Sequence, residues 1–106
     1  MTRTNATTKA ILIYLNTSGF KAWRTYNGGV YDLKRKSFRK NPSTLLGIPD
    51  ICGYNKKTGI SIFVEIKTGK DRLSYEQDIF LVEAKKAGCI AIVAKNFDHF
   101  LEQFKT

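Results

Sequence analysis

Two acidic residues and a lysine have the types and spacing to do chemistry together. Asp50 follows a proline, and Glu65 lies two positions before Lys67 at the end of an apolar run. Carboxylate oxygens are ligands that Mg²⁺ or Mn²⁺ prefer. A bound divalent cation can activate water and neutralise the charge that develops on a phosphate. An amine beside it could orient or help to deprotonate the attacking water, so these groups together favour phosphodiester hydrolysis.

The two acids meet only if the chain between them forms a hairpin. Residues 48–54 and 60–67 have the composition of strands, and an Asn-to-Gly turn signal separates them. Antiparallel pairing about the centre of that turn places Asp50 opposite Glu65 on one face of the sheet. Lys67 shares this face because side chains alternate along a strand. A slip of one residue would separate the acids, and a solvated ion-pair network is the alternative to a metal site.

The rest of the chain predicts helices packed on this sheet. Ser74, followed by Gln77, is a capping-box signature that opens a helix. A strand–helix–strand crossover after a hairpin implies a mixed sheet in an α/β fold. The expected helices cover 6–18, with Asn5 or Thr7 as the cap, 75–87, and a last segment that starts at Asn96 or Asp98. The further strands cover 20–26 and 89–94, and residues 30–46 form either a strand pair or a loop.

Length and composition favour a single domain over residues 1–106. The chain is 42% hydrophobic and 25% charged, which excludes a disordered or fibrous protein. No apolar run approaches the ~20 residues of a membrane span, and the N-terminus lacks the features of a signal peptide. Cys52 and Cys89 lie in apolar runs and are expected to be reduced, which predicts a cytoplasmic protein.

Positive charge is concentrated in the first half of the chain. The first 49 residues hold nine basic residues and one acidic residue, and the net charge of the whole chain is +9. Such an excess favours contact with the phosphates of a nucleic acid, although a solvated loop is the alternative. Trp23 is expected in the core rather than on DNA. The candidate DNA-binding residues are Arg24, Lys34, Arg35, Lys36, Arg39, Lys40, Lys70 and Arg72.

The strings GIPDICGY and IFVEIKTGKDRLSYEQ resemble the VRR-NUC branch of the PD-(D/E)xK nuclease superfamily. The resemblance implies an αβββαβ restriction-endonuclease-like core, dependence on Mg²⁺ or Mn²⁺, and cleavage of DNA. It implies that Asp50 and Glu65 bind the metal together with the carbonyl group of Ile66. It also implies that Lys67 is the catalytic lysine and that Gln77 belongs to the catalytic site.

The first helix departs from the family pattern, which places a glutamate there. No acid precedes Asp32, so Asn5 or another polar residue of that helix is expected at this position. The number of metal ions therefore stays open, and a catalytically impaired DNA-binding module is the alternative to a nuclease. Relatives in this Holliday-junction-resolvase-like class are dimers that act on four-way junctions. The resemblance thus implies branched DNA as substrate and a homodimer, whereas RNA gains no independent support.

Overall fold

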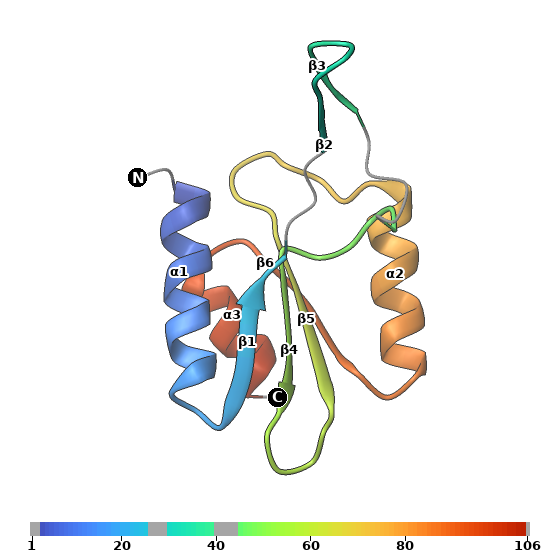
Figure 1. Ribbon diagram of the computed structural model, residues 1–106. Coiled ribbons are helices and arrows are strands. Elements are labelled where there is room, and N and C mark those ends of the chain that lie inside the picture. Colours follow the sequence, from blue (N-terminus) through green and yellow to red (C-terminus); the bar gives the residue numbers. More distant parts are fainter. Residues whose placement is uncertain (1–2, 26–29, 40–44, 106) are drawn as a thin grey trace.

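A four-stranded mixed sheet forms the centre of the molecule (Figure 1). The computed structural model describes residues 3–25, 30–39 and 45–105. The strand order is β1-β4-β5-β6, in which the first three strands are antiparallel and β6 runs parallel to β5. A parallel neighbour requires a crossover, which α2 supplies. The bounds are β1 Phe20–Arg24, β4 Ile51–Asn55, β5 Ser61–Ile66, β6 Ile90–Ala94 and α2 Tyr75–Lys86.

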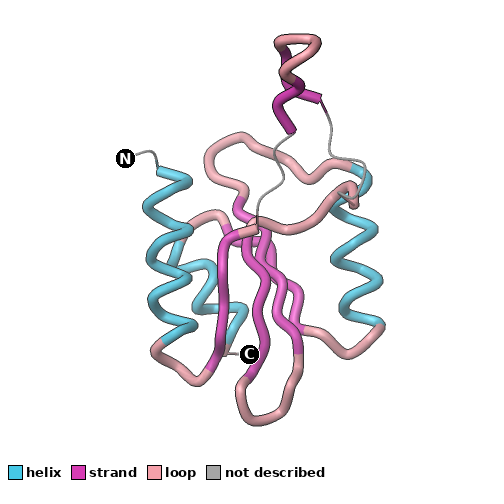
Figure 2. Tube along the Cα trace, in the orientation of Figure 1, coloured by secondary structure: helices cyan, strands magenta, loops and turns pink. Residues whose placement is uncertain are grey.

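Helices cover both faces of this sheet (Figure 2). Helices α1 (Arg3–Asn16) and α3 (Phe97–Phe104) pack on one face, where the larger core lies. Helix α2 packs on the other face against β5 and β6, with Leu81 and Ala84 close to Ala91. The alternation of buried residues along β5 fits this arrangement, since Ile62 and Val64 point into the larger core. The predicted α/β fold with a mixed sheet is therefore confirmed.

The face that carries α2 stays open over β1 and β4. Trp23 and Tyr54 lie there with 47% and 40% of their surface exposed, and their rings contact each other edge to face at 6.3 Å. The expectation that Trp23 is a core residue is wrong. An aromatic strand residue is buried only where a second layer covers it, and α2 covers β5 and β6 instead.

A second, two-stranded hairpin stands apart from the main sheet, at the top of Figure 1. It consists of β2 (Val30–Asp32) and β3 (Ser37–Arg39), which are antiparallel and joined by a turn over 33–36. Lys36 in this turn has a positive φ of 52°. Of the two options for residues 30–46, the strand pair is therefore present within the described residues.

The helix boundaries differ from the predictions mainly at the N-terminus. Helix α1 begins at Arg3, so Asn5 and Thr7 lie inside it and neither caps it. Helix α3 begins directly after its N-cap Asn96, whose side chain accepts a hydrogen bond from the His99 amide. Neither cysteine forms a disulfide in the described part of the chain, and both are half-buried. In that same part of the chain, none of the helices has the length and apolar character to cross a membrane.

Candidate active site

The β4–β5 hairpin has the predicted register. Ile51 pairs with Val64 and Tyr54 pairs with Ser61, which continues to Asp50 beside Glu65 at the open end of the hairpin. Asp50 Oδ2 accepts a hydrogen bond of 2.8 Å from the backbone amide of Ile66. One carboxylate oxygen is thereby fixed against the neighbouring strand.

The backbone around Asp50 is held by the residue that follows β1. Thr25 donates two hydrogen bonds, from its hydroxyl group to the Pro49 carbonyl at 2.5 Å and from its amide to the Asp50 carbonyl at 2.9 Å. Pro49 is fully buried. The Asp50 side chain therefore projects from a short segment whose position β1 and β5 both determine.

Glu65 is the most buried charged residue of the described chain, with 2% of its surface exposed. Its Oε1 atom lies 3.3 Å from Gln77 Nε2, which donates to it, and 3.8 Å from Lys67 Nζ. Its Oε2 atom is also buried, and no group of the described residues donates to it. A buried carboxylate oxygen without a donor is costly, unless a proton or a cation binds it.

The pKa of Glu65 reflects this environment. Burial is the main cause, and together with the adjacent Asp50 carboxyl it raises the pKa of Glu65 from 4.5 to about 8. Lys67 acts in the opposite direction but does not offset the other two effects. Without a cation, this environment therefore favours the protonated form of the Glu65 carboxyl.

Gln77 serves the start of α2 and the site at the same time. Its Oε1 atom accepts a hydrogen bond from the Ser74 amide at 2.8 Å, and its own amide donates to Ser74 Oγ at 3.2 Å. This capping box orients the side-chain amide so that Nε2 points to Glu65.

The loop before β4 packs against the same turn of α2. Gly47 in this loop has a φ of +80° and lies so close to the backbone of Glu76 that a Cβ atom would overlap it.

The donor set fits a hard divalent cation. Two carboxylates side by side repel each other, and oxygen ligands of this kind suit Mg²⁺ or Mn²⁺. The unpartnered Glu65 Oε2 atom is the specific observation that favours a cation here. Within residues 3–25, 30–39 and 45–105, no group of three or more acidic, histidine or cysteine side chains surrounds a possible metal position. The protein thus offers two acidic ligands, and other ligands must come from backbone oxygens, water or substrate.

Helix α1 brings hydroxyl groups, not an acid, to this end of the sheet. Thr4 Oγ1 lies 2.7 Å from Oγ1 of Thr68, the residue after Lys67. Asn5, proposed as a replacement for the missing acid, instead accepts a hydrogen bond of 2.7 Å from Arg24. The start of α1 therefore supports the loop that follows Lys67.

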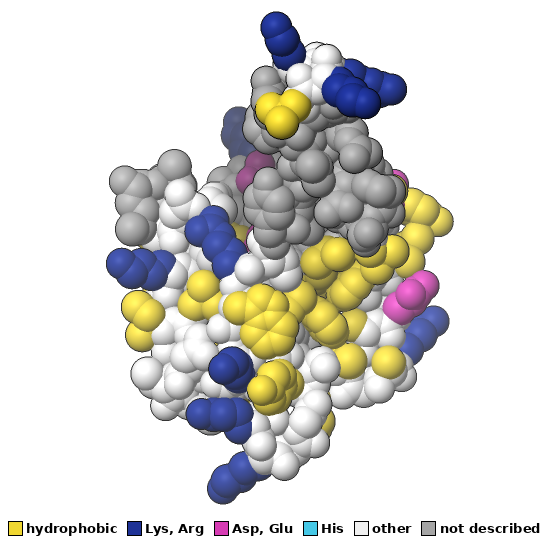
Figure 3. Space-filling model, in the orientation of Figure 1, with side chains coloured by type: hydrophobic (Ala, Val, Ile, Leu, Met, Phe, Trp, Pro, Cys, Tyr) yellow, Lys and Arg dark blue, Asp and Glu magenta, His cyan; other side chains and the backbone are white. Residues whose placement is uncertain are grey.

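The candidate DNA-binding residues fall into separate places. Lys34, Arg35 and Lys36 are exposed at the tip of the β2–β3 hairpin, where Figure 3 shows a group of basic side chains. Arg24 follows Trp23 on β1, so its side chain points to the opposite face of the sheet, away from the acids. Its guanidinium group donates a hydrogen bond to Asn5 of α1. The side chain of Arg39 and the whole of Lys40 lie outside the described residues.

Lys70 and Arg72 are nearer to the acids, in the loop between β5 and α2. They line a hollow together with Lys95, which is not among the residues predicted from the sequence. Lys95 follows β6, the parallel neighbour of β5, so pairing these two strands in the sequence would have placed it next to Lys67. The sequence signal existed, but it depends on a register between distant segments.

Comparison with known families identifies the domain. The model of the VRR-NUC domain matches residues 10–98, which is most of the chain. This chain belongs to the VRR-NUC domain family. The match includes Asp50, Glu65, Lys67 and Gln77, and the resemblance drawn from the sequence strings is therefore confirmed.

A solved structure supports the same fold for this VRR-NUC domain. Hjc, a Holliday junction resolvase from the archaeal hyperthermophile Archaeoglobus fulgidus, is similar with a TM-score of 0.54 and 22% sequence identity. The alignment covers 90% of this chain but 65% of the resolvase. At this identity, the likeness establishes the fold alone. A search of curated proteins gives no match.

Proposed function

We propose that this VRR-NUC domain is a metal-dependent endonuclease that hydrolyses phosphodiester bonds in DNA. The observation that carries the proposal is the convergence of Asp50, Glu65, Lys67 and Gln77 at one end of the β4–β5 hairpin. A net charge of +9 supports a polyanionic substrate. Membership of the VRR-NUC family supports nuclease chemistry.

Each side chain has a distinct task in this proposal. Asp50 and Glu65, with the carbonyl group of Ile66, would hold Mg²⁺ or Mn²⁺. The bound cation would supply Lewis-acid activation of water and neutralise charge that develops on the phosphate. Lys67 orients the attacking water and stabilises the negative charge that develops near it. Gln77 positions Glu65 through its hydrogen bond to Oε1 and so acts as a positioning residue.

The test combines cleavage with direct measurement of cation binding. Glu65→Gln preserves the shape of the side chain and removes its charge. We expect calorimetric Mn²⁺ binding to be lost and cleavage to fall at least about 100-fold, because a catalytic cation contributes several kcal/mol. Glu102→Gln, at an exposed glutamate on α3, is the matched control. Equal cation binding and equal cleavage by Glu65→Gln and the wild type would overturn the proposal.

The substrate we propose is branched DNA, such as a four-way junction. The similar fold of a Holliday junction resolvase supports this choice of substrate. A panel of duplex, single-stranded, flap and four-way-junction DNA, each with Mg²⁺, Mn²⁺ or chelator, tests it. Equal rates on plain duplex and junction would reject structure selectivity.

We propose further that the domain acts as a homodimer, which would bring two active sites to two strands. The open sheet face supports this. Trp23 is paired across the strands with Cys52, which is paired in turn with Phe63, and Figure 3 shows an apolar band across this face. The band continues over Phe80, whose ring lies 5.0 Å from that of Phe63, to a hollow lined by Leu45, Leu46, Ile79, Glu76 and Glu83. Contiguous exposed apolar surface of this kind marks an interface.

Light scattering tests the dimer. We expect the wild type to have twice the chain mass and Trp23→Ser to shift the protein towards the monomer at low concentration. A monomeric wild type at micromolar concentration would contradict the proposal. We propose as well that residues 1–106 form a single domain and that the protein is cytoplasmic, for which the only support is the composition of the sequence.

The second candidate function is a nuclease fold that binds DNA without cutting it. The absence of an acid in α1 favours it, since Thr4 and Asn5 engage Thr68 and Arg24 instead. In this case the wild type would shift branched DNA in a gel but would not cut it with Mg²⁺ or Mn²⁺. The cleavage panel therefore separates the two candidates.

A further inference from the structure

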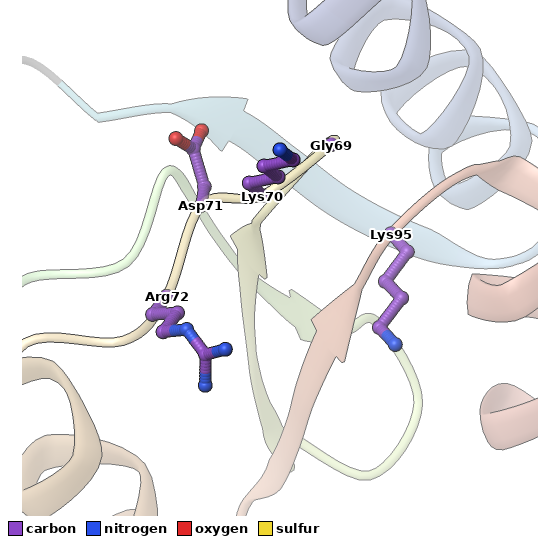
Figure 4. Close-up of a pocket in the computed structure, with 5 residues that line it drawn as sticks. All are labelled: Gly69, Lys70, Asp71, Arg72 and Lys95. Atoms are coloured by element: carbon purple, nitrogen blue, oxygen red, sulfur yellow. The ribbon is translucent and has the colours of Figure 1, made fainter.

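A basic hollow lies at the end of the parallel strand pair β5–β6 (Figure 4). Its volume is about 590 Å³, and it is lined by Gly69, Lys70, Asp71, Arg72 and Lys95. Three of these five residues are cationic and one is acidic. In Figure 4 the side chains of Arg72 and Lys95 extend to the same side, whereas those of Lys70 and Asp71 extend to the other. The hollow therefore presents concentrated positive charge to solvent.

The hollow adjoins the acidic residues of the candidate active site. Glu65 pairs with Val93 and Ile66 pairs with Ala94, and the Lys67 amide donates to the Ala94 carbonyl at 2.9 Å. Lys95 thus follows Lys67 across the sheet, at the ~4.8 Å spacing of neighbouring strands. A group bound in the hollow would therefore lie on the β6 side of a phosphate held at Asp50 and Glu65.

The walls of the hollow are fixed by contacts from several elements. The Lys95 amide donates to His99 Nδ1 at 3.1 Å, which ties it to α3. On the other side, the Asp71 amide donates to the Thr68 carbonyl at 3.2 Å, and Thr68 in turn contacts Thr4 of α1. Contacts within the protein therefore hold the backbone of Lys95 and of Asp71, which lies between Lys70 and Arg72, while the long basic side chains stay exposed.

We propose that this hollow binds a backbone phosphate of the DNA strand, next to the phosphate that is cleaved, and that Lys95 and Arg72 supply the charge. The inference rests on the proposed function. It implies that the bound DNA strand runs from Asp50 and Glu65 across the end of β6. A phosphodiester suits the site since it is anionic, exposed on a nucleic-acid backbone and attracted by several cations at once. The aromatic rings that would stack a base are absent from its lining.

The first test measures DNA binding in chelator, so that cleavage plays no part. Lys95→Ala and Arg72→Ala should each lower the slope of log K against log [salt] by about 1, the value expected for one lost phosphate contact. Lys95→Arg should retain the wild-type slope. Lys56→Ala, an exposed lysine in the turn at the opposite end of the β4–β5 hairpin, is the matched control and should leave the slope unchanged. An unchanged slope in Lys95→Ala, or an equal loss in the control, would overturn the inference.

The second test locates the phosphate. A set of oligonucleotides carries one uncharged methylphosphonate linkage at successive positions. For the wild type, one position near the acids should weaken binding, and for Lys95→Ala the same linkage should have no further effect. Additive losses at every position would overturn the inference.

Failure of this inference differs from failure of the proposed function. If the domain binds DNA without cutting it, the salt slope and the methylphosphonate result still stand or fall by themselves. If it cuts DNA and Lys95→Ala binds like the wild type, only the phosphate site is rejected.

Discussion

The two hairpins of this VRR-NUC domain differ in how firmly their charged groups are held. At the open end of β4–β5, the Asp50 and Glu65 carboxyls accept hydrogen bonds from Ile66 and Gln77, and Glu65 is almost fully buried. At the tip of β2–β3, residues 33–36 are all exposed, and the hairpin stands outside the main sheet. The first hairpin places its charges by packing, and the second one presents them to solvent.

This difference matches two kinds of interaction with DNA. Hydrolysis requires reacting groups at fixed positions, since small displacements are costly in rate. Attraction of a polyanion acts over a Debye length of about 8 Å at physiological salt and tolerates variable positions. We therefore expect substitutions in the first hairpin to change rate and stability, and substitutions in the second to change affinity and its salt dependence.

The largest effect should come from Lys67→Ala. Lys67 Nζ lies 3.8 Å from Glu65 Oε1, and the contact of Lys67 with β6 is made by its backbone amide, which alanine retains. We expect cleavage to fall by about 10² to 10⁴-fold, the range for a lost proton-transfer group, with DNA affinity within about twofold to threefold of the wild type. Single-turnover rates and gel-shift titrations measure the two quantities. A variant that loses DNA affinity but keeps the single-turnover rate would show that Lys67 attracts DNA and takes no part in hydrolysis, which would contradict the difference between the two hairpins.

The pH dependence of stability should be the next largest effect. The folded protein raises the pKa of Glu65 to about 8, from 4.5. Folding therefore favours the protonated form, and its stabilising contribution is complete below pH 4.5 and is lost as the pH rises to 8. Without metal, the free energy of unfolding should fall over this range by at most about 1.4 kcal/mol per pH unit.

Urea unfolding between pH 5 and 8, in chelator, measures this trend. Glu65→Gln should remove it, whereas Glu102→Gln, at an exposed position of α3, should show the wild-type trend. Mg²⁺ should restore stability at the upper end of the range, because it binds the ionised carboxylate. A Glu65→Gln variant with the same slope as the wild type would show that another group causes the trend.

The tip of β2–β3 should respond in the opposite way. Replacing Lys34, Arg35 and Lys36 together with alanine removes three exposed charges. We expect the salt slope of DNA binding to fall by up to about 3, and the free energy of unfolding to change by less than about 0.5 kcal/mol per residue. Filter binding at several salt concentrations and thermal unfolding measure both. A strong loss of stability would mean that these side chains belong to the packed structure after all.

The sequence predicts the first hairpin well because its register is set locally. Asn55 Oδ1 accepts hydrogen bonds from the amides of Lys57 and Thr58, at 2.8 and 3.1 Å. This closes the turn at a defined residue and aligns Asp50 with Glu65. The capping box of Ser74 and Gln77 is likewise a short-range signal. Such features depend on neighbours in the chain and can be read from it.

Features that depend on distant segments could not be predicted in the same way. The exposure of Trp23 follows from where α2 packs, and the place of Lys95 follows from the parallel register of β5 and β6. Neither is encoded in the residues next to them. The start of α1 at Arg3 also differs from the prediction, because Asn5, one of the two expected caps, lies inside the helix and accepts a hydrogen bond from Arg24 instead. Long-range contacts thus override the local preference.

The smallest effect should separate the two roles of Gln77. Ser74→Ala removes the capping hydroxyl but keeps the Gln77 amide, so we expect a loss of about 1 kcal/mol in stability with a small change in cleavage. Gln77→Glu keeps an oxygen that accepts from the Ser74 amide but removes the donor to Glu65. It should keep the stability of α2 and lower cleavage by about tenfold, as loss of a residue that orients a metal ligand does. If both variants change stability and cleavage in the same proportion, the contact to Glu65 has no function of its own, and the site depends on Gln77 only through the helix that it caps.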